Sequence, residues 1–371
     1  MVKKTIKVKF ASGFGSIGTI LEYLEKRFNV RVLDKDFDYF ICNESIYRCK
    51  EDFFELLNLK PEVIRIIFCW EALYPDLNLF DYAVCYDSFD SSRILALPVF
   101  DDRIGQLYNT VDELDLSKNS KKPEDILKEK TKFCNFIYGN SVSHPTRDAL
   151  FYKLSEYKQV ESLGRHLKNV EINDTRFCDD WAKISIDLKR PYKFSIAAEN
   201  ASFRGYTSEK IITSMMANTI PVYFGNPDIV NEFNSKSFIN VNEFNNLDDV
   251  LKRVKEIDEN DDLYCSIMAE PWRTPEQKER QKKANDKYLN GLYNIFEQEF
   301  NKAHRRPQGC WADYLYPGFF KSLSAQKQPE RKISFAENLF SVKNDSSKQY
   351  KLIRFFGVKI TINKNKKHLN P

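Results

Sequence analysis

The sequence carries little net charge and no long apolar run. Its 57 lysines and arginines nearly balance 53 aspartates and glutamates, which leaves a formal charge of +4. That balance gives little reason to expect nucleic acid as the main partner. No stretch of 18 apolar residues occurs, so we expect no membrane-spanning helix. The opening residues are too charged for a signal peptide, and we expect none.

Spaced metal ligands and cysteine pairs are also absent. The eight cysteines form no C-x-x-C pair, and several lie inside apolar runs. This usage predicts buried free thiols in a reducing compartment, neither a disulfide framework nor a zinc site. The four histidines show no ligand spacing. The acidic pairs Asp34/Asp36 and Asp36/Asp38 have the D-x-D form that binds Mn²⁺ in some enzymes, but acidic turns often produce it. We therefore expect no metal site and no obligatory cofactor.

What the sequence does contain is an alternation of strand-like and helix-like segments. With 371 residues, the chain is long for one domain and comfortable for two. In the first part, apolar periodicity predicts helices near 16–28 and 50–58, and the strands predicted are 5–10, 29–33, 38–42, 63–70, 81–86 and 94–100. Alternation of this kind indicates an α/β domain with a mostly parallel sheet.

A second α/β series follows a polar segment at 108–131, which reads as a linker or insertion. Its predicted strands are 132–140, 158–162, 193–198, 220–225 and 237–241, and its predicted helices are 147–155, 179–188, 208–218, 247–256 and 275–304. We therefore expect a first domain at 1–130, a second at 131–305 and an extension at 306–371. Two Rossmann-like α/β domains facing across a cleft form the GT-B architecture of many sugar-nucleotide transferases.

The stretch IAAENASFRGYTSEK, residues 196–210, is unusually charged for a strand-to-helix turn. Thr207 or Ser208 can cap a helix whose first turn holds Glu209 and Lys210. A cation at that end is unfavourable by roughly 0.3–1 kcal/mol, unless an anion is held there. Helix N-termini bind phosphates through free backbone N–H groups, and Tyr206 would add a hydroxyl donor. The alternative is an exposed turn with scattered charges.

Several positions in and after this stretch resemble the α-1,3-fucosyltransferase family, glycosyltransferase family 10, in its bacterial type. The matching residues are Glu199, Asn200, Tyr206, Ser208, Glu209, Lys210, Ile220, Pro221, Val222 and Gly225. The resemblance covers roughly residues 60–255 and is densest over 193–250. Ala201 stands where the family has Ser, and Ser208 where it has Thr; Ser still caps a helix.

The resemblance implies roles for these residues. Arg147, at the start of a predicted helix, would bind the donor diphosphate, for which arginine is a natural clamp. Glu71, after a strongly apolar strand, matches the family's catalytic Glu and would act as general base. The implied donor-binding set is Arg147, Glu199, Asn200, Tyr206, Ser208, Glu209 and Lys210. Glu209 would bind ribose hydroxyls and Glu199 fucose hydroxyls. The bland alternatives are a surface Glu71 and an Arg147 paired with Asp148 or Glu156.

The resemblance implies an inverting transfer of fucose from GDP-fucose to an N-acetyllactosamine-like oligosaccharide acceptor, which contains N-acetylglucosamine, in α-1,3 linkage and in bacterial surface glycan synthesis. A relative that uses another GDP-sugar or acceptor is the nearest rival. A catalytically inactive sugar-nucleotide binder is a further one. A different class, a nucleotide-dependent oxidoreductase, is suggested by Gly13, Gly15 and Gly18, which form a G-x-G-x-x-G after a strand.

The end of the chain is basic and partly apolar. Residues 351–371 hold six lysines and arginines and no acid, interleaved with apolar residues. That composition suits an anionic membrane surface. A solvated tail, or a strand that packs on the body, stays open as an alternative. We expect a cytoplasmic protein that lies peripherally on the inner membrane through this basic amphipathic tail.

Overall fold

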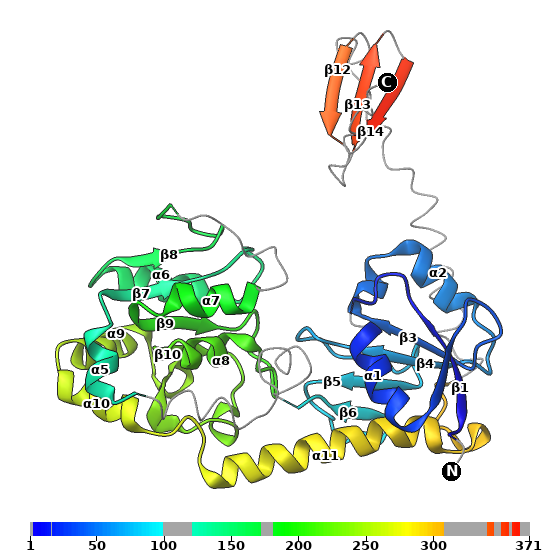
Figure 1. Cartoon of the computed structure of the whole chain (residues 1–371), viewed down its shortest axis with the longest axis horizontal. Coiled ribbons are helices and arrows are strands. Elements are labelled where there is room, and N and C mark those ends of the chain that lie inside the picture. The colour runs from blue at the N-terminus through cyan, green and yellow to red at the C-terminus, as the bar shows by residue number, and fades with distance from the viewer. Residues whose placement is uncertain are drawn as a thin grey trace, which may run out of the picture. The chain divides into compact units, whose positions relative to one another are not determined.

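The structure, a computed structural model, describes residues 3–15, 17–98, 121–171 and 181–307, and three strands further along the chain. The chain divides into two compact units, 1–308 and 309–371. The larger unit contains two parallel sheets, each with helices packed against it (Figure 1). Most of the predicted linker lies outside the described residues; its end forms the short helix α5, Pro123–Lys128.

The first sheet has six parallel strands in the order β2-β1-β3-β4-β5-β6. These strands are β1 (Thr5–Phe10), β2 (Asn29–Val32), β3 (Tyr39–Asn43), β4 (Ile64–Phe68), β5 (Tyr82–Cys85) and β6 (Ile94–Ala96). Helices α1 (Ile17–Arg27) and α2 (Lys50–Asn58) and the 3₁₀ turn η1 (Glu44–Tyr47) lie between them in the chain. Every residue of β3, β4 and β5 is buried, as in parallel strands covered on both faces. All eight predicted elements are confirmed, although β6 is shorter than expected.

The second sheet has five parallel strands in the order β11-β10-β9-β7-β8. They are β7 (Lys132–Phe136), β8 (Val160–Ser162), β9 (Tyr192–Ala198), β10 (Ile220–Phe224) and β11 (Ile239–Asn240). In the pairing of β9 with β10, Ile196 lies opposite Val222 and Ala198 opposite Phe224. The five strands were all predicted, but β11 is only a short pairing beside the 3₁₀ turns η3 (Ser235–Ser237) and η4 (Val241–Glu243).

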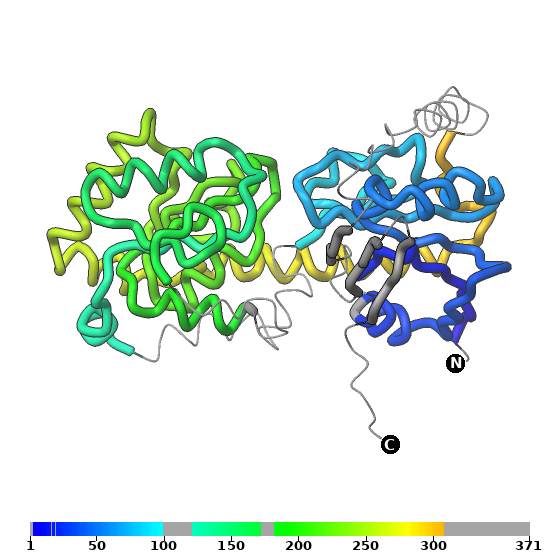
Figure 2. The backbone as a smooth tube through the Cα atoms, turned by 90° about the horizontal axis from the view of Figure 1, so that it is seen from above, coloured from blue at the N-terminus to red at the C-terminus, as the bar shows by residue number. Residues whose placement is uncertain are grey.

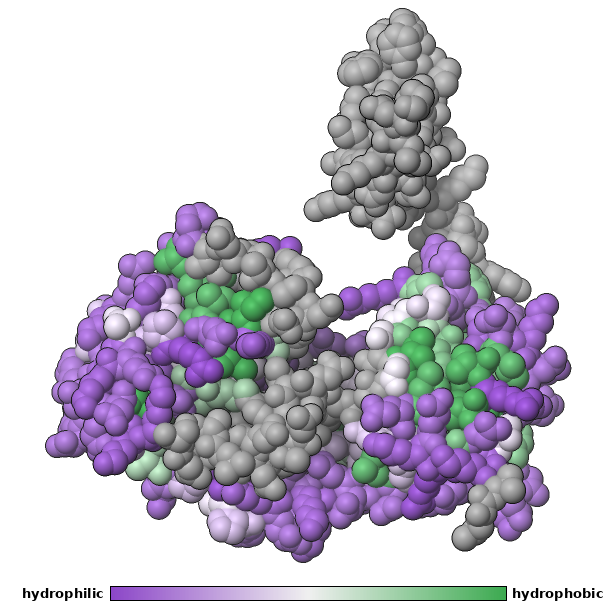
Figure 3. Space-filling view, in the orientation of Figure 1, coloured by the Kyte–Doolittle hydropathy of each residue, from purple (hydrophilic) through white to green (hydrophobic). Residues whose placement is uncertain are grey.

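The helices of the second half are α6 (Thr146–Ser155), α7 (Trp181–Lys189), α8 (Glu209–Met216), α9 (Leu247–Asp258), α10 (Asp261–Ala269) and α11 (Pro275–Glu297), with the 3₁₀ turns η2 (Ile229–Asn231) and η5 (Phe300–Lys302). The sequence reading missed α10, which begins at the cap Asn260 directly after α9. The outer faces of α9 and α10 are hydrophilic in the view of Figure 3.

Helix α11 connects the two halves. Thr274 and Gln277 form a reciprocal capping box at its start. Its far end carries Tyr288, Leu292 and Phe296 into the core of the first sheet. Figures 1 and 2 show the helix (yellow) running from the second half to the first. The segment 131–305, predicted as the second domain, therefore also contributes part of α11 to the core of the first half. The helix also ends at Glu297, short of the predicted 304, because the chain turns there into η5.

The smaller unit contains an antiparallel three-stranded sheet, β12 (Phe340–Asn344), β13 (Tyr350–Phe355) and β14 (Val358–Asn363). The register places Val342, Ile353 and Ile360 opposite one another on one face. It places Ser341, Arg354 and Lys359 together on the other face. The basic segment thus forms strands. By the same register Lys351, opposite Ile362, shares the first face, and Leu352, opposite Lys343, shares the second.

Candidate functional site

The predicted donor-binding residues gather where the order of the second sheet reverses. The chain leaves β7 toward β8 on one side, and β9 lies on the other side of β7. In parallel sheets, ligands bind outside the carboxyl ends of the strands at such a switch point. Arg147 lies on α6, which follows β7, and Glu199 and Asn200 directly follow β9. The sequence alone could not place these segments side by side.

Ser208, Lys210 and Glu199 form one polar cluster at the start of α8. Ser208 is the N-cap, but its side chain makes no capping hydrogen bond. Its backbone N–H and its hydroxyl instead donate to the Glu199 carboxylate, over 2.8 and 2.7 Å. The Lys210 ammonium donates to Glu199 Oε2 over 3.0 Å and to the Ser208 hydroxyl over 2.8 Å. Glu199 thereby fixes both residues.

Burial sets the electrostatics of this cluster. The Glu199 side chain is fully buried, and that burial raises the pKa of its carboxyl, against the opposing effect of Lys210 and Ser208. Burial by itself lowers the pKa of the Lys210 ammonium, but the Glu199 and Glu209 carboxylates outweigh it and hold that pKa well above its usual value. Lys210 is therefore cationic at neutral pH. Glu209 is partly exposed, with Oε1 3.5 Å from the Lys210 ammonium.

Gly225 allows Glu199 to lie where it does. A Cβ at position 225 would meet the Glu199 Cγ at 2.4 Å, far inside van der Waals contact. The Glu199 backbone N–H donates to the carbonyl of Phe224, the residue before this glycine. The glycine after β10, noted from the sequence as part of the family pattern, is thus required by close packing against the site.

Arg147 is almost fully buried beside the cluster. Its guanidinium stacks on the Tyr138 ring at 4.5 Å and donates to Asn200 Oδ1 and to the Asn140 carbonyl. Its Nε makes no hydrogen bond and lies 3.7 Å from Asp148 Oδ1. Asp148 itself lies 2.9 Å from the His166 ring nitrogen. Arg147 and Asn200 are thus brought together; the contact of either with a diphosphate stays a prediction.

Tyr206 links this edge of the second sheet to Glu71. Its buried hydroxyl donates to Glu71 Oε2 over 3.0 Å. Glu71 is exposed in the loop after β4, the position that the sequence predicted. Burial raises the pKa of Tyr206, which keeps its hydroxyl protonated as a donor. Because a tyrosine hydroxyl carries one proton, it cannot donate to Glu71 and to a phosphate at the same time.

The sequence reading left Arg204 without a role, and the structure gives it a partner. Its Nε and Nη2 donate to the Asp87 carboxylate over 2.5 and 3.2 Å. Asp87 follows β5 of the first sheet, and the hydrogen bond from Arg204 lowers the pKa of its carboxyl. The next residue, Gly205, has φ of 75°, and a Cβ there would meet the Tyr86 carbonyl oxygen at 2.2 Å. Sequence spacing carries no signal for this contact.

The glycine-rich loop after β1 does not have the electrostatics of a phosphate site. The Ser12 hydroxyl and the Gly13 N–H both donate to the Asp52 carboxylate. A carboxylate therefore occupies the place where a dinucleotide site would need an anion of the ligand. Phe14 in the same loop packs on Trp70, the neighbour of Glu71. The loop thus belongs to the surroundings of Glu71.

Three further findings concern the described residues alone. No group of three or more His, Cys, Asp or Glu side chains among them could hold a metal ion. The six cysteines described are free; Cys178 and Cys310 lie outside the described residues. Within the same residues, no helix is both long enough and apolar enough to cross a bilayer.

Comparison with known proteins places this arrangement in a family. Residues 127–304 match the family model "Glycosyltransferase family 10 (fucosyltransferase) C-term". The protein "Putative fucosyltransferase R654" of Acanthamoeba polyphaga mimivirus is 35% identical over 216 residues, 57% of this chain and 34% of its own. The α-(1,3)-fucosyltransferase FucT of Helicobacter pylori is 29% identical over 231 residues, 56% of this chain and 46% of its own. The match thus spans less than half the length of these relatives.

Solved structures share the fold. A crystal structure of an α1,3-fucosyltransferase with GDP superposes with a TM-score of 0.62 at 21% identity, covering 82% of this chain and 93% of that one. The structure with GDP-fucose gives a TM-score of 0.60 at 22% identity, covering 81% and 93%. The expected α/β fold of GT-B type, with two Rossmann-like halves, is confirmed. Residues 127–304, with this motif at the carboxyl edge of the second sheet, thus form a C-terminal domain of glycosyltransferase family 10, the fucosyltransferases.

Proposed function

We propose that the chain is an inverting fucosyltransferase that moves L-fucose from GDP-fucose to a hydroxyl of an N-acetylglucosamine-containing glycan, in α-1,3 linkage. The single observation that carries the proposal is the hydrogen bond from Tyr206 to Glu71. It joins the family's donor motif in the second half to a carboxylate at the edge of the first. A general base in the first half and a donor-binding cluster in the second suit the attack of an acceptor hydroxyl on the donor's sugar carbon.

In the proposed reaction, Glu71 takes the proton of the acceptor hydroxyl as its oxygen attacks C1 of fucose. The bond from C1 to the acceptor oxygen forms while the bond from C1 to the phosphate oxygen breaks. GDP leaves with the electron pair of that bond, so negative charge develops on the diphosphate. The anomeric configuration inverts because attack and departure occur on opposite faces.

Protein cations and backbone dipoles supply the charge stabilisation in this scheme. Lys210 is held cationic by Glu199 at the N-terminus of α8, where free backbone N–H groups also favour an anion. Arg147 lies close by, bound to Asn200. For the nucleotide, we keep the assignment of Glu209 to ribose hydroxyls. The Glu199 oxygens already accept from Ser208 and Lys210, which favours a supporting role for Glu199 over a direct contact with fucose.

Because these groups offset the leaving-group charge, we expect transfer without a divalent metal. Activity that survives a chelator supports that expectation, and activity restored only by added Mg²⁺ or Mn²⁺ would overturn it.

A donor screen tests the proposed function. GDP-fucose should raise the thermal midpoint of the protein, whereas NAD(P) should not. The reverse result would contradict the proposal and favour the alternative of a nucleotide-dependent oxidoreductase. Among GDP-sugars offered with N-acetyllactosamine, GDP-fucose should give transfer, and the product should carry an α-1,3 link. Transfer from another GDP-sugar, or to another position, would establish the rival relative with a different donor or acceptor.

We also propose that the smaller unit binds an anionic membrane surface in a bacterial cell that builds surface glycans, with the enzyme on the cytoplasmic side. The paired basic positions Arg354 and Lys359 support it, since cationic side chains on one face of a sheet can meet anionic lipid headgroups. The full chain should bind vesicles containing anionic lipid, and a chain ending at 308 should not. Equal binding of both chains, or equal binding to zwitterionic vesicles, would reject the proposal.

A further inference from the structure

A buried lysine behind the donor motif has no part in the mechanism above. Lys189 is the last residue of α7 and is only 5% exposed. Helix α7 packs against α8 (Figure 1), and the Lys189 side chain reaches α8. We infer that Lys189 is a positioning residue for the donor diphosphate: it holds the first turn of α8 through two hydroxyls and takes up a proton when the diphosphate binds. The inference rests on the proposed function and deepens it.

Two hydroxyls of α8 transmit the contact to its first turn. The Lys189 amine donates to Thr213 Oγ1 over 2.7 Å and to Ser214 Oγ over 3.1 Å. The Thr213 hydroxyl donates in turn to the carbonyl of Glu209, and the Ser214 hydroxyl to the carbonyl of Lys210, each over 2.8 Å. Hydrogen bonds from hydroxyls back to carbonyls four residues earlier often bend a helix. Donation from Lys189 therefore helps to fix the direction of the turn that faces the proposed diphosphate.

The same contact reaches the sheet. Ser214 Oγ lies 3.0 Å from Ser195 Oγ on β9, and the Ser195 hydroxyl donates to Asn135 Oδ1 on β7 over 2.9 Å. All three side chains are fully buried. Strands β7 and β9 are the two at the switch point where the donor-binding residues gather. Lys189 is thus connected to the helix and to both strands that carry the site.

The end of α7 does not itself require Lys189. A lysine in the last turn of a helix often donates to the carbonyls of that turn. Among the described residues, however, both hydrogen bonds of the Lys189 amine go to α8. The carbonyl of Arg190, the next residue, accepts instead from the Lys130 amine over 2.7 Å. The side chains of Asp187 and Arg190 pair with each other in solvent, so neither is a partner of Lys189.

Burial sets the charge of Lys189. Its contact partners are neutral hydroxyls, and burial lowers the pKa of its ammonium from 10.5 to about 7. Of the charged groups around it, Glu209 raises this pKa, Lys210 lowers it and Glu199 raises it. These three groups come from α8 and from the loop after β9, the segments that carry the donor motif. The charge held at the start of α8 therefore affects the protonation of Lys189.

An anion at the start of α8 would favour the protonated form of Lys189. A diphosphate adds negative charge beside Glu209 and Lys210, and nearby negative charge stabilises an ammonium over a neutral amine. Because a pKa of about 7 leaves both forms populated at neutral pH, binding of the diphosphate takes up protons. Hydrogen bonds from an ionised donor are also stronger than those from a neutral one, so the protonated amine holds Thr213 and Ser214 more firmly.

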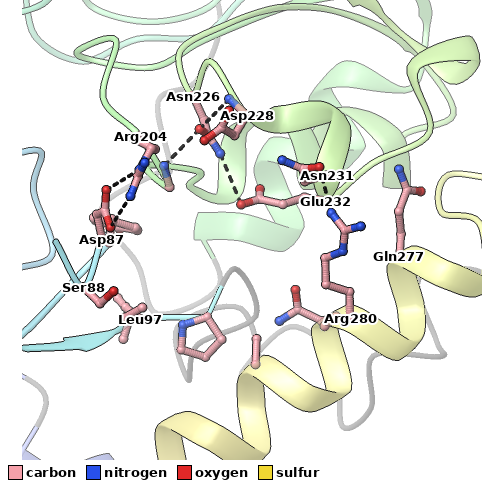
Figure 4. Close-up of a pocket in the computed structure, with 16 residues that line it drawn as sticks. Asp87, Ser88, Leu97, Arg204, Asn226, Asp228, Asn231, Glu232, Gln277 and Arg280 are labelled. Carbon is pink, nitrogen blue, oxygen red and sulfur yellow. Dashed lines mark hydrogen bonds and ion pairs between the residues drawn. The ribbon is translucent and has the colours of Figure 1, made fainter. Parts of the chain in front are cut away.

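Glu232, a second titratable group beside the donor motif, belongs to a separate network. Figure 4 shows its carboxyl bound to Asn226, and its other oxygen accepts from the Thr207 hydroxyl. Burial raises the pKa of Glu232 to about 8. Near pH 7 most of its carboxyl already carries a proton, so Glu232 has little capacity to take one up when an anion binds.

The test measures proton uptake when GDP-fucose binds. Calorimetric titrations near pH 7 are run in HEPES and in Tris, whose different ionisation enthalpies reveal the protons exchanged. The diphosphate of GDP-fucose is esterified at both ends and does not titrate in this range. Lys189→Gln keeps an N–H donor without a titrating group, and Lys189→Met removes both. Lys183→Gln, an exposed change on α7, and Lys130→Gln are the matched controls; circular dichroism checks that all variants are folded.

A nearby opposite charge shifts a pKa by roughly one unit or more, and a shift of one unit from about 7 corresponds to uptake of roughly 0.4 proton at pH 7. We expect about that uptake in the unmodified protein and in both controls, and none in either Lys189 variant. The Kd of the unmodified protein for GDP-fucose should rise roughly threefold from pH 6 to 7.5, and that of Lys189→Gln should stay level. Uptake that persists in Lys189→Gln, that is lost in a control or that is absent from the unmodified protein overturns the inference.

The positioning role has its own readout. Lys189→Met should bind GDP-fucose several-fold more weakly than Lys189→Gln, because no donor then holds the Thr213 and Ser214 hydroxyls. Equal affinity of the two variants would reject that role. If the Lys189 variants do not fold, Thr213→Val decides: it removes one acceptor of the ammonium, so the pH of largest uptake should move down, and an unchanged pH overturns the inference.

Failure of the proposed function would look different. Proton-linked binding of GDP-fucose without fucose transfer to the acceptors offered would contradict the transferase and leave the role of Lys189 standing. Transfer without proton uptake on binding would do the reverse. A protein that does not bind GDP-fucose at all would overturn both.

Discussion

At the scale of single residues, the site depends on side chains whose partners fix their charge. Glu199 is buried and accepts hydrogen bonds from Ser208 and Lys210, so one carboxylate orients the cation that faces the proposed diphosphate. Glu71 lies outside that network, and its carboxylate accepts a hydrogen bond from Tyr206. Exposure leaves Glu71 accessible to an acceptor, whereas the Glu199 side chain is closed to solvent.

Glu71→Gln should abolish transfer and spare donor binding. The amide can still accept from Tyr206, but it cannot take a proton from the acceptor hydroxyl. Loss of a general base costs typically 10²–10⁴-fold in rate, and we expect kcat to fall by about that factor. Glu62→Gln, an exposed change before the same strand, is the control. Steady-state kinetics and thermal protection by GDP-fucose give the two readouts; near-normal turnover would place the base elsewhere.

Glu232 should make the stability of the fold depend on pH. Burial, with the nearby acids Glu199 and Asp228, raises the pKa of Glu232 from 4.5 to about 8, although Thr207 and Asn226 donate to it. Between those pH values the folded state keeps a proton that the unfolded state releases. The contribution of Glu232 to stability is therefore fully present below pH 4.5 and is lost as pH rises through about 8.

Glu232→Gln should remove this loss. Urea midpoints measured from pH 5 to 9 should fall more steeply in the unmodified protein than in the variant. Asp228→Asn is the control, because Asp228 is exposed and adds only part of the electrostatic effect. Parallel pH profiles for the unmodified protein and Glu232→Gln would contradict the prediction.

At the scale of elements, the loop after β9 contacts the loops after β4 and β5, and these contacts join the two halves of the larger unit. The loop after β9 carries Tyr206 to Glu71 and Arg204 to Asp87. Gly205 between them lies against the backbone of Tyr86, so a larger residue would separate the loops. Three consecutive residues of this loop, Arg204, Gly205 and Tyr206, therefore hold the proposed donor motif against the first half, where the proposed base Glu71 lies.

Breaking the Asp87–Arg204 pair should lower turnover more than donor affinity. Arg204→Gln frees the loop from β5, so Tyr206 meets Glu71 in a smaller fraction of molecules, while Lys210 and Arg147 keep their own partners. We expect kcat to fall several-fold and thermal protection by GDP-fucose to persist. The double change Asp87→Arg with Arg204→Asp should recover part of kcat. A double variant no better than Arg204→Gln would show that the charge pair does not position the loop.

At the scale of the whole molecule, α11 makes the two halves one folding unit. It starts at the cap Thr274 beside the second sheet, and Phe296 near its end packs on Tyr39 and Phe28 of the first, with ring centroids 4.7 and 5.9 Å apart. Contacts between segments so distant in sequence resist opening of either half. The smaller unit forms its own sheet from residues after 308.

Phe296→Ala should therefore destabilise the first half, although Phe296 comes after the strands of the second half in the sequence. Truncation of a buried Phe costs about 3–5 kcal/mol. Lys287→Ala on the exposed side of the same helix should stay within about 0.5 kcal/mol of the unmodified protein. Urea unfolding followed by fluorescence measures both. A Phe296→Ala protein as stable as the control would mean that the end of α11 is not part of that core.

The sequence by itself determined the α/β alternation, nearly all strands and helices of the described residues, and the resemblance to fucosyltransferases that singled out Glu71 and the stretch 196–210, because these depend on local periodicity and on residue spacing. Only the tertiary structure decided that Glu199 holds Lys210, that Tyr206 reaches Glu71, and that Arg204 binds Asp87. It also showed that α11 serves both halves and that part of the basic tail forms a sheet. The contacts of Tyr206, Arg204 and α11 join segments far apart in the chain, and only the packing of two sheets and a connecting helix brings such segments together.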